Sequence, residues 1–159
     1  MELWDVLTAE GEPTGRTKVR GQKLLSGEYH LFVHIWIQND KKEYLIQKRA
    51  DHLEWQPGVW AITGGSVLAG EDSLTGAIRE TSEEVGINLQ AAQMTFIARL
   101  QRFDGFADIW LATGDTHQWG DVHLGPEVSQ IRWVTKQQIQ QMISNGEFFA
   151  FHYLDMLPD

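Results

Sequence analysis

Apolar and polar residues alternate along several stretches of this chain in the way that predicts β-strands. The clearest stretch is 30–37, which is rich in β-branched and aromatic residues. A polar turn follows over 39–42, and the apolar pattern resumes over 43–49, so these two stretches are predicted to form a hairpin. Weaker patterns predict further strands over 3–7, 60–63, 94–102, 106–113 and 128–134.

A helical repeat replaces this alternation after residue 72. Asp72 and Ser73 supply N-terminal capping chemistry, and Gly86 suits a left-handed residue at the C-terminal end. Residues three and four apart form the apolar stripe of this helix: Leu74, Ala77, Ile78, Thr81 and Val85.

Two more helices are predicted near the end of the chain. One runs over 135–144 from a Thr135 N-cap, and the other lies in the aromatic segment 148–157. The stretches 14–26, 51–60 and 115–125 are interpreted as loops. Strands, a helix, more strands and then helices indicate an α+β fold with a mixed sheet.

The predicted helix after Asp72 carries carboxylates on a second face. Glu80, Glu83 and Glu84 share that face, because positions three and four apart are neighbours on a helix. Three like charges repel at this distance, whereas a divalent cation would bind them through their oxygens. A solvated acidic face is the alternative. The preceding Gly64-Gly65 pair predicts a turn whose carbonyl can approach a ligand, which favours the metal site.

This stretch resembles the signature of the Nudix family, G-x5-E-x7-R-E-U-x-E-E-x-G-U, where U is bulky and apolar. The matching residues are Gly65, Glu71, Arg79, Glu80, Glu83, Glu84, Gly86 and Ile87. The one departure is Thr81 at the first U position, which leaves every charged position filled. The resemblance implies a Nudix-type α/β/α sandwich with a mixed β-sheet, and we expect one such domain over 1–159.

The resemblance also implies an activity and the residues that carry it. Family members cleave diphosphate linkages in nucleoside diphosphate derivatives, usually with Mg²⁺ or Mn²⁺. By position in the signature, Glu80, Glu83 and Glu84 would hold the metal with the Gly64 carbonyl. Arg79 would orient a glutamate, and Glu71 would support the site from behind. The general base is either a signature glutamate or Glu127, which precedes the strand over 128–134.

Other segments resemble the isopentenyl diphosphate isomerase branch of this superfamily. They are the opening 2–16, His30-Leu31, Gln47-Lys48-Arg49 and Pro57-Gly58-Val59-Trp60. That isomerase uses a cysteine after the tryptophan strand, and this chain has no cysteine. Ser66 also lies near an expected histidine. The chain is therefore interpreted as a hydrolase, with an isomerase-like enzyme and a non-catalytic nucleotide-binding module as alternatives.

Several residues outside the signature are candidates for contacts with the substrate. Lys48 and Arg49 end a predicted strand where phosphate could bind, as could cations of the 14–26 stretch, although a solvated surface explains either group. His30 and His34 share one strand face and are interpreted as packing or hydrogen-bonding residues. Most of a set of aromatic residues is assigned to the core, although each could stack on a base: Trp55, Trp60, Trp119 and Phe148.

The composition of the chain limits its possible partners, cellular compartment and kinds of metal site. The 159 residues carry a net charge of −9, which argues against nucleic-acid or membrane partners. Without cysteine there is neither a disulfide framework nor a thiolate zinc site. No apolar run suits a bilayer span and no signal-like segment opens the chain. We expect a cytoplasmic monomer or homodimer that acts on a small-molecule diphosphate.

Overall fold

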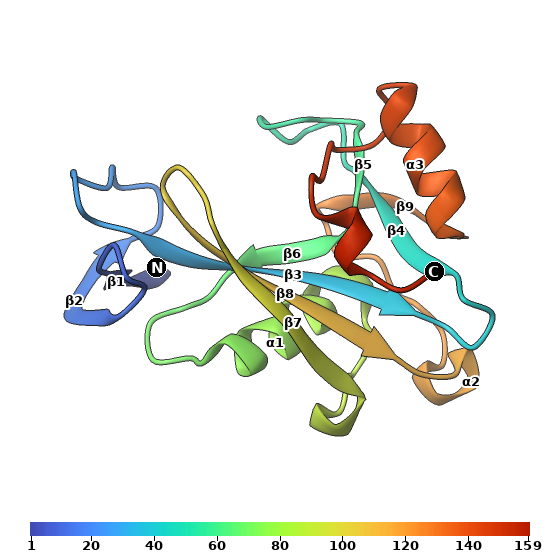
Figure 1. Cartoon of the computed structure of the whole chain (residues 1–159), viewed down its shortest axis with the longest axis horizontal. Coiled ribbons are helices and arrows are strands. Elements are labelled where there is room, and N and C mark those ends of the chain that lie inside the picture. The colour runs from blue at the N-terminus through green and yellow to red at the C-terminus, as the bar shows by residue number, and fades with distance from the viewer.

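A computed structural model describes all 159 residues of the chain (Figure 1). The strands are β1 (Leu3–Leu7), β2 (Pro13–Val19), β3 (His30–Gln38), β4 (Tyr44–Arg49), β5 (Trp60–Ala61), β6 (Thr63–Ser66), β7 (Met94–Gln101), β8 (Gly105–Thr113) and β9 (Val128–Val134). The helices are α1 (Ser73–Val85), α2 (Thr116–Trp119) and α3 (Lys136–Ser144), with short 3₁₀ turns at Ala91–Gln93 and Leu154–Met156. None of the helices combines the length and apolar character of a bilayer-spanning segment.

Strand β3 is the centre of a seven-stranded mixed sheet. It pairs in parallel with β8 over its whole length and antiparallel with β6, while β7 extends the sheet beyond β8. The predicted hairpin between 30–37 and 43–49 is confirmed only beside its turn, because β3 and β4 pair antiparallel at Gln38 and Tyr44 and not along the rest of their length. Strand β4 instead pairs with β5 and β9. The two strands therefore diverge after their turn (Figure 1).

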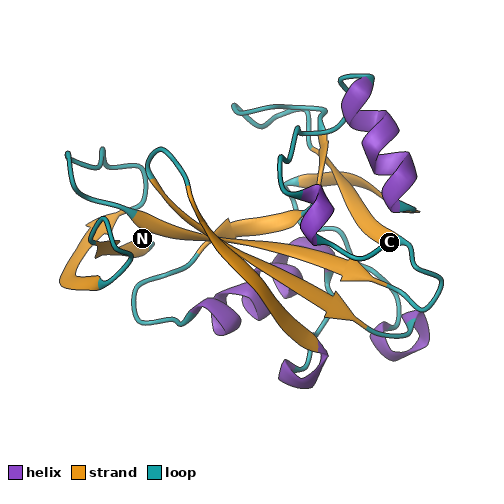
Figure 2. Cartoon of the chain, in the orientation of Figure 1, coloured by secondary structure: helices purple, strands orange, loops and turns teal.

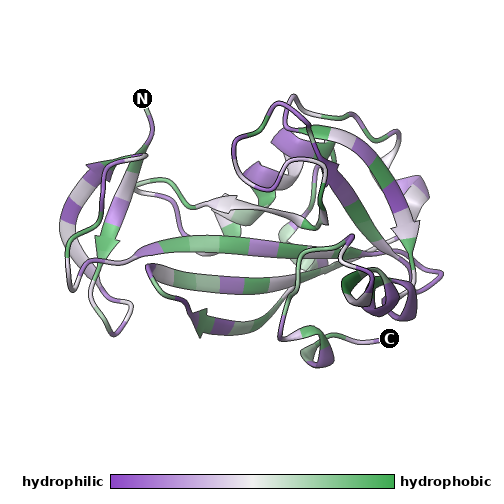
Figure 3. Cartoon of the chain, turned by 90° about the horizontal axis from the view of Figure 1, so that it is seen from above, coloured by the Kyte–Doolittle hydropathy of each residue, from purple (hydrophilic) through white to green (hydrophobic).

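Helices cover both faces of this sheet, which confirms the predicted α+β sandwich (Figure 2). One apolar cluster joins Val33 and Ile35 of β3 to Ala77 and Val85 of α1. The other joins further sheet residues to α3 and to the C-terminal segment, through Ile139, Met142, Phe148, Tyr153 and Leu154. The strands that separate the two clusters carry mostly apolar residues, as Figure 3 shows along the middle of the molecule.

The segment 14–26 is partly a strand, contrary to its prediction as a loop. Strand β2 pairs antiparallel with β1 in a separate two-stranded sheet. Arg16 and Lys18 lie on β2 and both bind the buried carboxylate of Glu28, which explains a strand of such polar composition. The hairpin is tied to the loop before α1, because the Ala69 amide donates to the Leu3 carbonyl.

Three other predictions of elements need correction. Gly64 and Gly65 lie inside strand β6 and not in a turn. The predicted last helix is reduced to the 3₁₀ turn Leu154–Met156, although its aromatic residues pack on the sheet as expected. Part of the predicted loop 115–125 forms the short helix α2. The remaining predicted strands and the helices α1 and α3 are confirmed with small shifts at their ends.

Candidate active site

Helix α1 presents its acidic face because both of its ends and its apolar stripe are fixed. The Asp72 side chain accepts a hydrogen bond from the Thr75 amide, and Gly86 closes the helix in the left-handed conformation. Ala77, Thr81 and Val85 are buried against the sheet. The buried Thr81 hydroxyl donates to the Ala77 carbonyl, so the polar group of this unusual signature residue has a hydrogen-bond partner within the helix.

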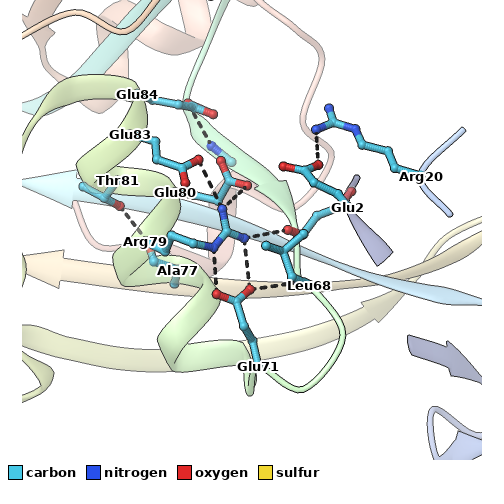
Figure 4. A network of polar contacts seen from close by, with 12 residues as sticks. Glu2, Arg20, Leu68, Glu71, Ala77, Arg79, Glu80, Thr81, Glu83 and Glu84 are labelled. Atoms are coloured by element: carbon cyan, nitrogen blue, oxygen red, sulfur yellow. Dashed lines mark hydrogen bonds and ion pairs between the residues drawn. The ribbon is translucent and has the colours of Figure 1, made fainter. Parts of the chain in front are cut away.

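Arg79 connects the carboxylates of the site (Figure 4). Its Nε and Nη2 atoms donate to the two oxygens of Glu71 at 2.7 and 3.0 Å. Its Nη1 atom donates to Glu80 at 3.1 Å and to Glu83 at 3.2 Å. Because Nη2 also donates to the Ser66 carbonyl, the guanidinium fixes α1 against β6. Glu71 is fixed in turn by the Leu68 amide, which donates to it at 2.8 Å.

Glu84 is held by a different group of residues. Its Oε2 atom accepts a hydrogen bond from Gln47 Nε2 at 2.7 Å and a longer one from the Gly64 amide at 3.4 Å. The Thr63 hydroxyl donates to Gln47 Oε1 at 3.2 Å. This contact orients the Gln47 amide so that its donor end points to Glu84. The buried relay from Thr63 to Glu84 thus joins strands β6 and β4 to helix α1.

Two glycines of β6 allow the helix and the sheet to approach. A Cβ atom on Gly65 would lie 2.4 Å from Cδ of Glu80, and one on Gly64 would lie 2.7 Å from the Val33 carbonyl oxygen. Neither glycine has a positive φ. Glycine is therefore needed here for space, not for a turn.

The carboxylates open into a cleft of about 670 Å³. Glu80, Glu83 and Glu84 line one wall, and Glu127 lines the same cleft from the loop before β9. That loop is fixed to the end of α1, because the His123 and Gly125 amides donate to the Val85 and Glu84 carbonyls. Positive charge at the cleft comes from Arg20, Arg49 and Arg102, and apolar surface comes mainly from Phe32, Leu53, Trp55, Phe149 and Phe151.

Burial changes the protonation of two of the glutamates. It raises the pKa of Glu84 to about 8, against the hydrogen bond from Gln47. It also raises the pKa of Glu80 to about 7, although the charge and hydrogen bond of Arg79 oppose this shift. Burial would likewise raise the pKa of Glu71, but the hydrogen bonds from Arg79 and the Leu68 amide lower it overall. Glu71 is therefore ionised, and Glu80 and Glu84 hold protons more readily than ordinary glutamates.

The donor set of this wall fits a divalent cation. Glu80 and Glu84 are desolvated carboxylates, and negative charge from neighbouring glutamates adds to the rise in each pKa. A hard cation bound between such oxygens would offset both effects. In the structure no three acidic or histidine side chains are already arranged around one point. Arg79 occupies oxygens of Glu80 and Glu83, while Gln47 occupies one of Glu84.

Most of the candidate site residues gather at this cleft, but not all. Gly64 lines it, with its amide directed at Glu84, and Arg49 lines it while Lys48 does not. His34 accepts or donates a 2.6 Å hydrogen bond with the Tyr153 hydroxyl, and His30 stacks on Trp4, so both are packing or hydrogen-bonding residues as predicted. Three of the aromatic candidates are buried: Trp60, Trp119 and Phe148.

Several cleft residues were not singled out for this role by the sequence. Gln47 lies within an apolar strand pattern, and its contact with Glu84 spans 37 positions of the chain. Arg102 follows β7 and lies over the Phe32 ring, 5.0 Å from its centroid. Trp55 was one of the stacking candidates, and it is 56% exposed and lines the cleft under the guanidinium of Arg49. The tryptophan beside the Pro57-Gly58 turn is the one local signal that points to this wall.

Comparisons with known proteins agree with this geometry. A family model described as NUDIX domain matches residues 28–155. The chain is 40% identical over 161 residues to an uncharacterized Nudix hydrolase of Listeria monocytogenes, covering 99% of this chain and 94% of that protein. It is 29% identical over 177 residues to an isopentenyl-diphosphate Delta-isomerase of Pectobacterium atrosepticum, covering 100% and 94%. The crystal structure of DR0079 from Deinococcus radiodurans shares the fold, with a TM-score of 0.79 at 18% identity over 98% of this chain and 96% of that one.

Proposed function

This chain belongs to the Nudix hydrolase family, and from that membership we propose that it cleaves a diphosphate linkage in a small molecule with Mg²⁺ or Mn²⁺ bound. The substrate is a nucleoside diphosphate derivative or a related compound. The observation that carries this proposal is the wall of Glu80, Glu83 and Glu84 on α1, organised by Arg79 and open to a cleft. The net charge of −9 argues against a nucleic-acid partner. We place the enzyme in the cytoplasm, with a small molecule as its substrate.

In this proposal the three glutamates of α1 hold the cation, together with the Gly64 carbonyl. A bound divalent cation polarises phosphoryl oxygens and lowers the pKa of water. Arg79 keeps Glu80 and Glu83 in place while Glu71 fixes Arg79 from the other side. Gln47 positions Glu84. The protein therefore supplies three neighbouring carboxylates held by Arg79 and Gln47, and their mutual repulsion favours a cation.

The other residues of the cleft are assigned to the water and to the substrate. Glu127 is the proposed general base and takes a proton from the attacking water on its carboxylate oxygen. It lines the same cleft as the α1 glutamates, and its loop is bonded to the end of α1, which supports this role. Arg49 is proposed to bind a phosphate oxygen, and Trp55 offers an exposed face to the remainder of the substrate.

One observation favours a second candidate, isomerisation of isopentenyl diphosphate: the relative named for that reaction aligns with the whole chain. The residues of β6 in the cleft argue against it. They are Gly64, Gly65 and Ser66, and the chain has no cysteine to protonate carbon. The full set of signature glutamates favours hydrolysis over both the isomerase and a module that only binds nucleotides.

A turnover screen tests the proposal. The panel contains nucleoside di- and triphosphates, ADP-ribose, sugar nucleotides, dinucleoside polyphosphates and prenyl diphosphates, each incubated with Mg²⁺ and with EDTA. Phosphorus NMR should detect phosphate or nucleoside monophosphate released from at least one compound, and only with the cation. Tight binding of a nucleotide without any release would instead support the binding module.

A further inference from the structure

Residues 1–27 lie outside the matched NUDIX domain, yet they reach the candidate active site. The domain match begins at residue 28, after the β1–β2 hairpin. Glu2, just before β1, and Arg20, just after β2, line the same cleft as Glu80, Glu83 and Glu84. Figure 4 shows this pair beside the carboxylates of α1. The hairpin therefore adds one cation and one anion to the site.

The ion pair of Arg20 differs from the other ion pairs of the hairpin. Arg20 Nη1 donates to Glu2 Oε2 at 2.6 Å, and the two side chains are 56% and 42% exposed. Arg16 and Lys18 instead bind Glu28, whose side chain is 5% exposed and also accepts from the Leu25 amide. Removing the Glu28 contacts would leave a buried charge, whereas the Arg20–Glu2 contact can open into water at little cost.

Arg20 also lies in the electric field of the catalytic carboxylates. Its hydrogen bond to Glu2 raises its pKa, and the negative charges of Glu2, Glu127 and Glu80 raise the pKa further. Because Arg20 lines the cleft together with Glu80 and Glu127, it borders the space where the proposed diphosphate would bind. A guanidinium matches phosphate oxygens at least as well as it matches a carboxylate.

We propose that Arg20 binds an anionic oxygen of the diphosphate, and that the Glu2 carboxylate occupies Arg20 until the substrate arrives. This inference rests on the proposed function and extends it to a segment outside the family domain. Glu2 and the substrate compete for one guanidinium. The β1–β2 hairpin then contributes to specificity, because only an anion that binds Arg20 more tightly than Glu2 does can take its place.

A purely structural role for the pair makes a different prediction. If the Arg20–Glu2 contact only fastens the hairpin, losing either partner loosens the hairpin and weakens binding. Competition predicts opposite signs, because removing Arg20 deletes a substrate contact and removing the Glu2 charge frees that contact. The two roles are therefore separable with single substitutions.

Titration calorimetry of the full chain with methylenediphosphonate and Mg²⁺ measures both effects on a diphosphate that cannot be hydrolysed. Arg20→Ala should weaken binding by about tenfold, the value of one charge-assisted hydrogen bond. Glu2→Gln should tighten binding by about twofold to fivefold, the value of an exposed ion pair. Lys23→Ala is the matched control, since Lys23 is an exposed cation of the same N-terminal segment that does not line the cleft.

The double variant Glu2→Gln/Arg20→Ala completes the cycle. It should bind like Arg20→Ala alone, because Glu2 has nothing left to compete for. Tighter binding through Glu2→Gln in both backgrounds would mean a general charge effect and would overturn the competition. Wild-type affinity in Arg20→Ala, weaker binding in Glu2→Gln, or no binding of the probe by the wild type would also overturn it. Hydrolysis in the screen above is an independent measurement, so either proposal can fail alone.

Discussion

Glu80, Glu83 and Glu84 occupy neighbouring positions on α1 but have three different environments. The side chain of Glu83 is 58% exposed, that of Glu80 is 15% exposed, and Glu84 is buried beside Gln47. Burial raises the pKa of Glu84 to about 8 and that of Glu80 to about 7. Protons and cations therefore compete for the same oxygens at neutral pH, and the cation gains affinity as the pH rises.

Glu83→Gln and Glu84→Gln should each lower Mg²⁺-dependent turnover by more than about a hundredfold, because even residues that only support a metal ligand cost about 10–100-fold. Each change keeps the side-chain shape and removes one charge from the cluster. Steady-state kinetics at saturating Mg²⁺ measures the loss, and circular dichroism checks the fold. Glu10→Gln, an exposed glutamate that does not line the cleft, is the control. Near-native rates in both variants would remove these glutamates from the site.

The stability of the cation-free protein should depend on pH through Glu84. The folded state keeps this proton up to a pKa of about 8, whereas an ordinary glutamate loses it near 4.5. Raising the pH through this window removes a proton that only the folded state binds, so the free energy of unfolding falls. Glu84→Gln cannot ionise. Its melting temperature in EDTA should exceed that of the wild type by an amount that grows from pH 5 to pH 8.

Comparing the variant with the wild type removes an opposing contribution from histidine. Burial lowers the pKa of His34 to about 3, so that group stabilises the fold as the pH rises towards its ordinary value. The effect is the same in both proteins and cancels in the difference. Mg²⁺ should raise the melting temperature of the wild type most at the upper end of the window. A difference that does not change with pH would contradict the assignment to Glu84.

At the scale of single elements, the sequence predicts helices better than strand partners. Helix α1 was found with both ends, since Asp72, Gly86 and the apolar stripe act within the helix itself. Strand β3 was found as well, but its partners β6 and β8 lie far along the chain. The pattern alone favoured the adjacent strand. Strand β2 was missed because its cations are neutralised by Glu28, a residue outside the strand.

Alanine substitutions of the two glycines of β6 should distinguish the positioning of Glu80 from the stability of the sheet. In Gly65→Ala the new methyl group meets the end of the Glu80 side chain, which can move at little cost to the fold. Turnover should then fall by about a hundredfold, because misplacing a catalytic group by about 1 Å has that effect. In Gly64→Ala the methyl group meets the Val33 carbonyl in the sheet, which cannot move alone. That variant should lose about 1–3 kcal/mol of stability.

Kinetics and thermal melting of the two variants provide the comparison, and each variant is the control for the other. We expect Gly65→Ala to lose mainly turnover with a small drop in melting temperature, and Gly64→Ala to show the larger drop in melting temperature. Equal losses of stability with unchanged turnover in both would mean that Glu80 does not need its present position.

At the scale of the molecule, the site joins segments that the signature does not contain. The signature predicted the α1 wall, and Glu127, which the resemblance offered as one of two candidates for the general base, lines the cleft. Gln47, Arg20 and Arg102 come from β4, from the end of β2 and from the end of β7. Their approach to α1 depends on how the sheet pairs, which local patterns do not encode. Lys48 and Arg49 are adjacent in sequence, but only Arg49 lines the cleft.

This assembly predicts which reaction the chain performs on a prenyl diphosphate. Isomerisation needs one group that protonates carbon and another that removes a proton, both beside the apolar chain of the substrate. The β6 wall offers Gly64, Gly65 and Ser66, and none of these has suitable acidity. His34 lines the same cleft, but burial lowers its pKa to about 3, so its ring is neutral at neutral pH and is too weak an acid to protonate carbon. The signature glutamates of the cleft lie on α1, where they suit a metal-assisted attack of water on phosphorus. Isopentenyl diphosphate incubated with the chain and Mg²⁺ should therefore yield no dimethylallyl diphosphate by product chromatography.

A parallel incubation with a genuine isomerase shows that the product can be detected. If dimethylallyl diphosphate forms at an enzymatic rate with the wild type but not with Glu84→Gln, the site catalyses isomerisation and the proposal of hydrolysis is overturned.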